Sequence, residues 1–219
     1  MSTHLLAIDT CTRRASIALR DAHMLHAEIT WECERQETAH VAERVQHMLR
    51  TSHVDAAQIG AVGVAIGPGS YTGVRCGLAI AKGMAVALNI PLIGVNAFDV
   101  VAYAQPAIKQ SLMIVVEVGR SRVATCPYDL VGARMLSGEW RIRTWQELRD
   151  DIYEPTWVCG DLRGDLIDVL ATNANAHIAP ATLNVRRAGY LAEIAWGRWT
   201  KGEVDDALTL SALYPAEPT

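Results

Sequence analysis

The residues with the clearest chemical potential form a glycine-rich loop, GPGSYTG, at residues 67–73. The loop follows an apolar segment, residues 59–66, that is typical of a buried strand, and it precedes a helical segment at residues 72–88. A strand, a glycine turn and a helix N-terminus in this order present backbone N–H groups that can bind an anion. The same arrangement also serves as a tight strand-to-helix connection, and the loop by itself leaves both interpretations open.

Phosphate chemistry requires more than this loop. A Walker A motif has lysine and then serine or threonine after its last glycine, whereas Val74 and Arg75 follow Gly73, which excludes a P-loop NTPase. Asp9 ends the first apolar strand, where it could cap a turn or lie near a nucleotide, but no glycine follows it. The candidate contacts to a nucleotide or anion are Asp9, Thr10, Gly67, Gly69 and Ser70.

Metal and nucleophile signatures are absent from the sequence. His40 and His47 lie about two helical turns apart, which is too far to bind one ion, and there is no HExxH or HxxxH motif. Ser70 lies outside a GxSxG elbow. We therefore expect no metal site, no catalytic residue and no peptidase activity.

The composition indicates an ordinary globular protein. Of its 219 residues half are hydrophobic, and 20 basic against 24 acidic residues give a formal charge of −4. This balance argues against a protein that binds nucleic acid by itself, because phosphate binding needs a basic face. Five scattered cysteines, no signal-peptide pattern and no long apolar run predict reduced thiols in the cytoplasm and no membrane span.

The first hundred residues alternate strands and helices. Apolar runs at residues 5–9, 15–19 and 24–31 predict an antiparallel meander. Residues 38–51 predict an amphipathic helix with Thr38 as its N-cap. The helix at residues 72–88 is rich in glycine and alanine, so we expect it to pack on two sides, against its own sheet and against a partner.

The pattern then repeats. Residues 112–118 and 123–128 repeat the strand, acid, turn and strand of the N-terminus, with Glu117 in the place of Asp9. Thr144 and Glu147 form a capping-box pattern, a longer helix is predicted at residues 185–200, and an edge strand at residues 208–213. We expect two lobes, residues 1–104 and 105–219, with the last helix packing back on the first lobe.

Four segments together resemble the TsaB (YeaZ) family, long labelled inactive homologues of the M22 glycoproteases. They are LAIDT at residues 6–10, QETAH at 36–40, GPGSYTGVRCG at 67–77 and IGV at 93–95. The resemblance implies an α/β fold of the actin-like ATPase class (ASKHA, ribonuclease H-like), with two lobes of duplicated βββαβα-type core. It also implies a non-catalytic cytoplasmic subunit that binds and activates the TsaD-type threonylcarbamoyltransferase, which with a TsaE-type ATPase forms N6-threonylcarbamoyladenosine in tRNA.

The family pairs with TsaD through its first two helices, which correspond to residues 38–51 and 72–88 and imply an interface. Its candidate residues are His40, Val41, Arg44, Val45, Met48, Tyr71, Arg75, Leu78, Ala81, Lys82 and Ala85. We expect contact with tRNA only through the complex, a homodimer in isolation, no membrane contact and no cofactor beyond weak ATP or ADP binding shared with the partner. The second lobe departs from the family at residues 117–122 and in the tail.

The alternative is an active phosphotransferase of the sugar or acetate kinase-like class. It would need a phosphate-contacting glycine after Asp9, which is missing, and an adenosine-site glycine motif, of which residues 160–164 are a reduced version.

Overall fold

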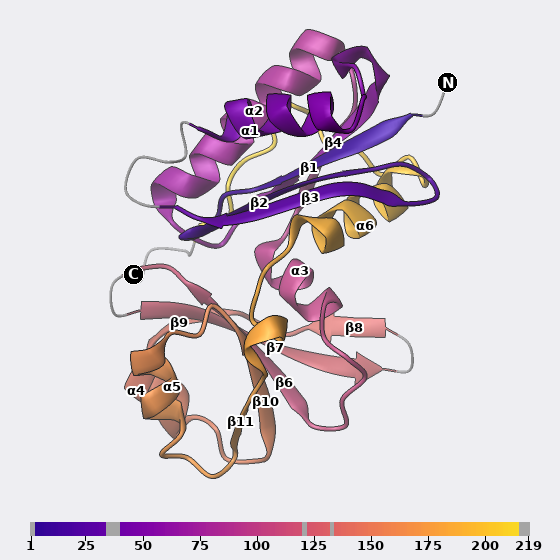
Figure 1. Ribbon diagram of the computed structural model, residues 1–219. Helices are drawn as coiled ribbons and strands as arrows, with labels where there is room; N and C mark the ends of the chain where they lie inside the picture. Colours follow the sequence, from indigo (N-terminus) through magenta and orange to yellow (C-terminus); the bar gives the residue numbers. More distant parts are fainter. Residues whose placement is uncertain (1–2, 34–39, 120–121, 132–133, 215–219) are drawn as a thin grey trace. The chain divides into compact units, whose positions relative to one another are not determined.

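The computed structural model describes residues 3–33, 40–119, 122–131 and 134–214 (Figure 1). The chain divides into two compact units, one of residues 1–100 and 187–213 and the other of residues 101–186 and 214–219. The first unit is therefore built from both ends of the sequence. Across the described residues, no helix combines the length and the apolar character that crossing a membrane requires.

The first unit contains a mixed five-stranded sheet in the order β3-β2-β1-β4-β5. The first three strands form the predicted antiparallel meander, and β4 and β5 run parallel to β1. The strands are β1 His4–Asp9, β2 Arg14–Arg20, β3 Leu25–Glu32, β4 Ile59–Ala65 and β5 Leu92–Val95.

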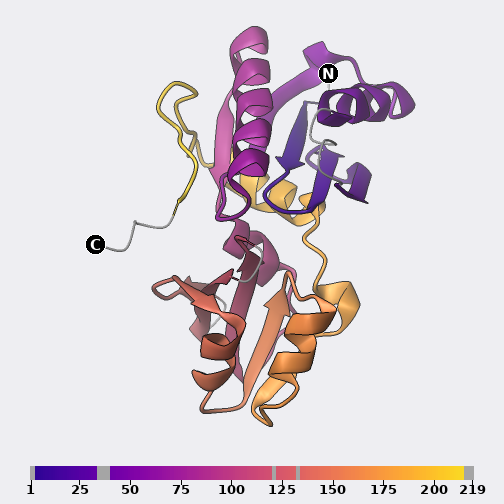
Figure 2. The ribbon, with the colours of Figure 1, turned by 90° about the vertical axis from the view of Figure 1, so that its left-hand side faces the viewer.

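Helices cover both faces of this sheet because its central strand is apolar on both sides. Leu6 and Ile8 of β1 point to the core under α1 (Val41–Thr51) and α2 (Tyr71–Leu88). The alternate residues Leu5 and Ala7 point to a second core under α6 (Ala188–Trp199) and α3 (Ala97–Tyr103). Figure 1 shows α1 and α2 on one face and α6 on the other, and Figure 2 shows α2 along its length.

The second unit repeats the same strand order in a sheet β11-β10-β6-β7-β8, with β9 also paired to β7. β6 and β7 are antiparallel, and β10 and β11 run parallel to β6, as β4 and β5 do to β1. The bounds are β6 Ser111–Glu117, β7 Arg122–Val131, β8 Arg134–Ser137, β9 Arg141–Thr144, β10 Thr156–Gly160 and β11 Ala176–Ile178. The duplicated core expected from the sequence is present.

Two short helices, α4 (Trp145–Asp150) and α5 (Gly164–Leu170), pack on this second sheet through Leu148, Leu166 and Leu170. The predicted capping box starts α4: the Thr144 hydroxyl accepts the Glu147 N–H at 3.2 Å, and the Glu147 carboxylate accepts the Thr144 N–H at 2.7 Å. Short 3₁₀ turns occur at Ala56–Gln58 and Ala181–Leu183.

The structure differs from the sequence-based expectation in the tail and at the start of α1. Residues 208–213 form no strand. Instead the Leu213 N–H donates to the Ile66 carbonyl at 2.7 Å, and just before this segment the Asp205 carboxylate accepts the Gly94 N–H at 2.8 Å, so isolated hydrogen bonds tie residues 205–213 to the first unit. Thr38, the expected N-cap of α1, lies outside the described residues, and His40 occupies the N-cap position without a side-chain cap bond.

Candidate functional site

The glycine loop packs directly against the turn that follows β1. A Cβ atom added to Gly69 would lie 2.2 Å from the Cys11 carbonyl oxygen, and one added to Gly73 would lie 2.2 Å from the Thr10 carbonyl oxygen. One on Gly77 would lie 2.3 Å from the Thr10 hydroxyl oxygen. Close contact with the turn after β1, through its backbone at Gly69 and Gly73 and through the Thr10 side chain at Gly77, therefore explains these glycines without reference to a ligand.

The polar groups of the loop and the turn bond to one another. The Thr10 hydroxyl donates to the Gly73 carbonyl at 2.7 Å, and the Asp9 carboxylate accepts the Cys11 N–H at 2.9 Å. The Ser70 N–H donates to the Cys11 carbonyl, and its hydroxyl accepts the Gly73 N–H at 3.4 Å. The structure thus brings Asp9, Thr10, Gly69 and Ser70 together in a junction where Asp9 and Thr10 are buried, Gly69 is half-buried and Ser70 is exposed.

Gly67 has a different role. Its φ of 101° lies in the left-handed region that only glycine adopts at low cost, and an added Cβ would meet the Leu213 carbonyl oxygen at 2.9 Å. The loop therefore needs this glycine to turn the chain from β4 toward α2 and to make room for the returning tail segment.

Six of the residues expected at an interface lie in the core of the first unit. Each is at most 7 % exposed, because the apolar stripe of each amphipathic helix faces its own sheet. They are Val41, Val45, Met48, Leu78, Ala81 and Ala85. A partner that docks on α1 and α2 would meet the other side chains of these helices.

The outward face of α2 carries small or apolar side chains. Tyr71 is 58 % exposed and Val86 is 65 % exposed, and Gly83 between them has no atom within 4 Å of an added Cβ. Arg75 lies over the Tyr71 ring at 3.7 Å, and the Lys82 ammonium donates to the Leu208 carbonyl at 3.5 Å. Between these two cations the exposed surface of the helix is uncharged.

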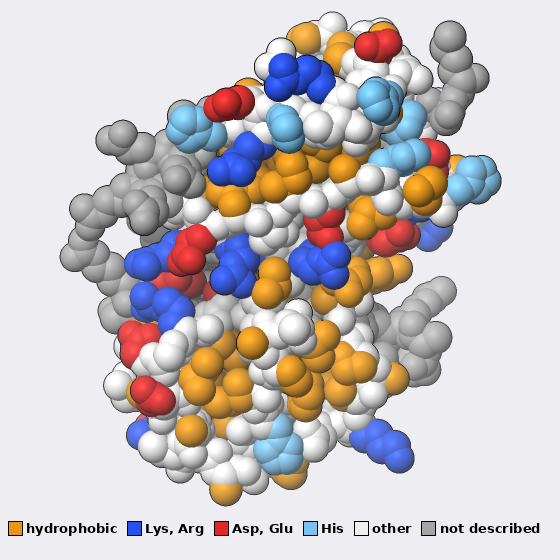
Figure 3. Space-filling view, in the orientation of Figure 1, with side chains coloured by type: hydrophobic (Ala, Val, Ile, Leu, Met, Phe, Trp, Pro, Cys, Tyr) orange, Lys and Arg blue, Asp and Glu red, His pale blue; other side chains and the backbone are white. Residues whose placement is uncertain are grey.

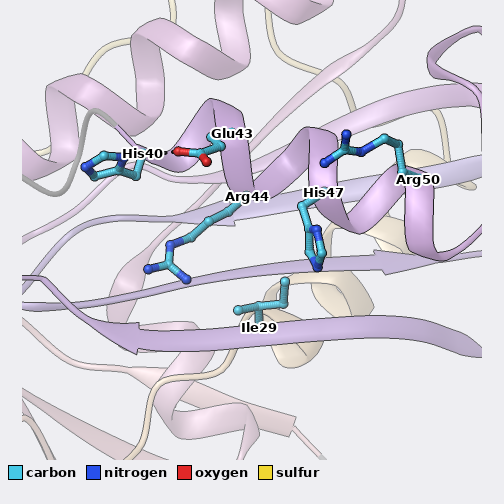
Figure 4. Close-up of a pocket in the computed structure, with 6 residues that line it drawn as sticks. All are labelled: Ile29, His40, Glu43, Arg44, His47 and Arg50. Atoms are coloured by element: carbon cyan, nitrogen blue, oxygen red, sulfur yellow. Dashed lines mark hydrogen bonds and ion pairs between the residues drawn. The ribbon is translucent and has the colours of Figure 1, made fainter.

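A hollow of about 410 Å³ lies between α1 and β3. Figure 4 shows the Arg44 and His47 side chains extending from α1 toward β3, where Ile29 lies. Arg44 stacks over the Trp31 ring at 4.5 Å, and the His40 ring lies 3.2 Å from the Glu43 carboxylate. The space-filling view shows basic and histidine side chains gathered over this helix (Figure 3).

The hollow includes three residues of α1 that sequence reasoning did not select: Glu43, His47 and Arg50. The helical periodicity that places the apolar residues of α1 against the sheet also identifies these three polar residues. Once Val41, Val45 and Met48 face the sheet, the polar positions between them must face outward.

In the second unit the acids at the strand ends are engaged in ion pairs. Arg163 lies 3.5 Å from Glu117, and Arg186, whose side chain is 1 % exposed, lies 3.2 Å from Asp161. The Asp161 carboxylate also accepts the Glu117 N–H at 3.2 Å. These acids therefore contribute to the internal order of the unit.

Comparison with solved structures shows the fold. The chain is similar to a Pseudomonas aeruginosa protein described as similar to peptidase YEAZ, with a TM-score of 0.78 and 20 % identity over 97 % of this chain and 99 % of the other. A second structure, YeaZ from Pseudomonas aeruginosa, has a TM-score of 0.77 and 20 % identity, covering 97 % of this chain and 100 % of the other. The expected α/β fold of the actin-like class is confirmed.

Curated relatives carry the name tRNA threonylcarbamoyladenosine biosynthesis protein TsaB. The Haemophilus influenzae protein is 24 % identical over 96 % of this chain and 92 % of its own length. The Escherichia coli protein is 40 % identical, but the match covers 42 % of this chain and spans only 39 % of that relative. Residues 31–148, more than half of the chain, match the family described as TsaD, tRNA N6-adenosine threonylcarbamoyltransferase. The chain therefore belongs to the TsaD family and, within it, to the TsaB (YeaZ) group.

Proposed function

We propose that this chain is a non-catalytic subunit in the formation of N6-threonylcarbamoyladenosine in tRNA, and that it binds and activates a TsaD-type transferase. The names of the TsaB relatives support a role in threonylcarbamoyladenosine biosynthesis. The match of residues 31–148 to the TsaD family supports common ancestry of this chain and the proposed partner. A subunit of the same fold as its enzyme can pair with it through equivalent helices.

The observation that carries the proposal is the way the glycine loop is used. Gly69 and Gly73 lie against the backbone of Cys11 and Thr10. The N–H groups of Ser70 and Gly73 are already bonded within the loop and the turn, so they are not presented to a phosphate. The loop instead fixes the start of α2, whose outward face has open space at Gly83 and an exposed apolar side chain at Val86. Such a face suits close approach of another helix. On α1, the hollow toward β3 offers polar side chains that a partner could also contact.

The remaining parts of the proposal follow from charge and context. A formal charge of −4 supports contact with tRNA only within the complex. We propose that a TsaE-type ATPase completes the complex in the cytoplasm. Without a TsaD-type partner, the same two helices would pair two copies of this chain. Any ATP or ADP binding would be weak and shared with the partner.

Reconstitution tests the proposal. Purified TsaD-type and TsaE-type proteins, tRNA, ATP and the activated threonylcarbamoyl donor would be assayed for tRNA modification with and without this chain. We expect modification to depend on the chain, and modification at the same rate without it would overturn the proposal. The isolated chain should hydrolyse ATP negligibly, whereas turnover of about 1 s⁻¹ or more would favour the phosphotransferase alternative.

A further inference from the structure

We propose that His4, Asp21 and His26 form a binding site for a divalent transition-metal ion, with Zn²⁺ as the ion that matches the ligands best. The three side chains each offer one ligand atom, and all three atoms lie within 4.8 Å of one another. The proposal concerns a part of the first unit outside the glycine loop and the outward faces of α1 and α2.

The sheet topology brings these residues together. Leu5 pairs with Arg20 between β1 and β2, and Arg20 pairs with Leu25 between β2 and β3. His4, Asp21 and His26 each lie next to one of these paired residues, at the end of the sheet where β1 begins and β2 turns into β3. Figure 1 shows these two features at the same end of the sheet, and Figure 3 shows histidine and acidic side chains gathered there.

The carboxylate of Asp21 is held in one orientation. Its Oδ1 atom accepts the N–H groups of His23 at 2.7 Å and Met24 at 2.9 Å, while Oδ2 lies 2.9 Å from Nε2 of His26. The two backbone bonds fix the side of the carboxylate that faces the imidazole. Such support of a ligand by neighbouring hydrogen bonds is a regular feature of metal sites.

His4 supplies the second observation. It is 4 % exposed, and its Nδ1 atom is buried with no hydrogen-bond partner among the described residues. Its ring centre lies 5.0 Å from that of His26. A buried ring nitrogen without a partner is costly, and a bound cation beside the ring would account for a buried histidine at the first position of β1.

The ligand set determines the class of ion. Two imidazoles and one carboxylate suit Zn²⁺ and its neighbours in the first transition row, whereas Ca²⁺ and Mg²⁺ prefer oxygen ligands. Three protein ligands leave a fourth position of a tetrahedral ion for water or another ligand. The sequence predicts no metal site because short histidine spacings are all that a local pattern can reveal. His4 is distant in sequence from Asp21 and His26, and only the pairing of the strands brings it beside them.

Metal titration of the full chain tests the proposal. Metal-free protein, prepared with a chelator under reducing conditions, would be titrated with Zn²⁺ by calorimetry and with Co²⁺ by visible absorption. We expect one ion per chain at this site and a Co²⁺ spectrum without a thiolate charge-transfer band, because the ligands are nitrogen and oxygen. No binding, or a spectrum dominated by thiolate ligands from the cysteines, would overturn the proposal.

Variants identify the ligands. His26→Asn and Asp21→Asn should each weaken Zn²⁺ binding by at least ~100-fold, because loss of a direct ligand exceeds the 10–100-fold typical of supporting groups. His23→Ala is the matched control: its exposed side chain lies in the same turn, and its backbone N–H to Asp21 is kept. Unchanged affinity in the ligand variants, or an equal loss in the control, would contradict the assignment.

Wild-type protein provides a readout that does not depend on the folding of any variant. Imidazole resonances assigned by NMR should shift on adding Zn²⁺ for His4 and His26 and should not shift for His23. Shifts confined to other histidines would overturn the proposal. The thermal unfolding midpoint of the wild type should also rise with Zn²⁺, because the site exists only in the folded chain.

Discussion

The hydroxyl of Thr10 donates a buried 2.7 Å hydrogen bond to the carbonyl oxygen of Gly73. This bond joins the turn after β1 to the first turn of α2, two segments that are 63 residues apart in the sequence. The phosphotransferase alternative would need a phosphate-contacting glycine in this turn, whereas the chain has Thr10 there and uses its hydroxyl to hold α2.

Replacing Thr10 with valine tests the strength of this junction. Thr10→Val keeps the shape of the side chain but removes this bond, while the Gly73 carbonyl keeps its place in the hydrogen-bond ladder of α2, so we expect the free energy of unfolding to fall by about 0.5–1.5 kcal/mol. Urea denaturation measures the change. Thr51→Val serves as the control, because the exposed Thr51 hydroxyl bonds only carbonyls of its own helix, and we expect a change within about 0.5 kcal/mol.

The glycine positions in and after the loop should differ sharply in their tolerance of alanine. Gly69→Ala and Gly73→Ala each place a methyl group 2.2 Å from a backbone oxygen, so each should destabilise the fold by about 1–3 kcal/mol or more. Gly83→Ala meets no atom within 4 Å and should stabilise α2 by about 0.5–1 kcal/mol. Equal effects at all three sites would show that the loop does not pack as described.

The proposed partner surface on α2 is tested by a charge at Gly83. Gly83→Glu should leave the fold intact while weakening co-purification with the TsaD-type partner, because a close helix contact would bury the carboxylate. Gly197→Glu on α6, which also has no atom within 4 Å of an added Cβ, is the matched control and should bind normally. Ala81→Glu, by contrast, places a charge in the core and should unfold the chain. Normal binding by Gly83→Glu would remove this face of α2 from the interface.

The capping box at the start of α4 should make stability depend on pH. Hydrogen bonds from the Thr144 backbone and then from its side chain lower the pKa of Glu147 below its ordinary value of 4.5. A lowered native pKa means that the contribution is present above about pH 4.5 and is lost as the pH falls through the native value. The difference in unfolding free energy between wild type and Glu147→Gln should therefore shrink in acid. A difference that stays constant from about pH 7 to about pH 3 would contradict this linkage.

Local patterns predicted much of this fold. The meander, the helix after the glycine loop and the capping box of Thr144 and Glu147 all depend on neighbouring residues, and all three are confirmed. The segment 208–213 was wrongly predicted as a strand, because its apolar residues fill gaps beside the sheet: the Leu210 side chain lies against Gly94.

The candidate sites were harder to predict because they depend on which face of an element is covered. An apolar stripe such as Val41, Val45 and Met48 suits a partner helix and the chain's own sheet equally well, and only the tertiary structure places it in the core. The proximity of His4 to His26 likewise depends on the register of three strands, which no local spacing encodes.

The return of α6 to the first unit has a consequence for biosynthesis. Leu5 and Ala7 near the start of the chain share a core with Leu191 and Ala195, which the ribosome adds close to the end of translation. Domains that are continuous in sequence can fold as soon as they emerge, N-terminal first. Here the sheet that forms first must wait, with one apolar face covered only in part by α3, until the second unit has been synthesised. Nascent chains of this protein would therefore be most in need of chaperone protection while the second unit is still being made.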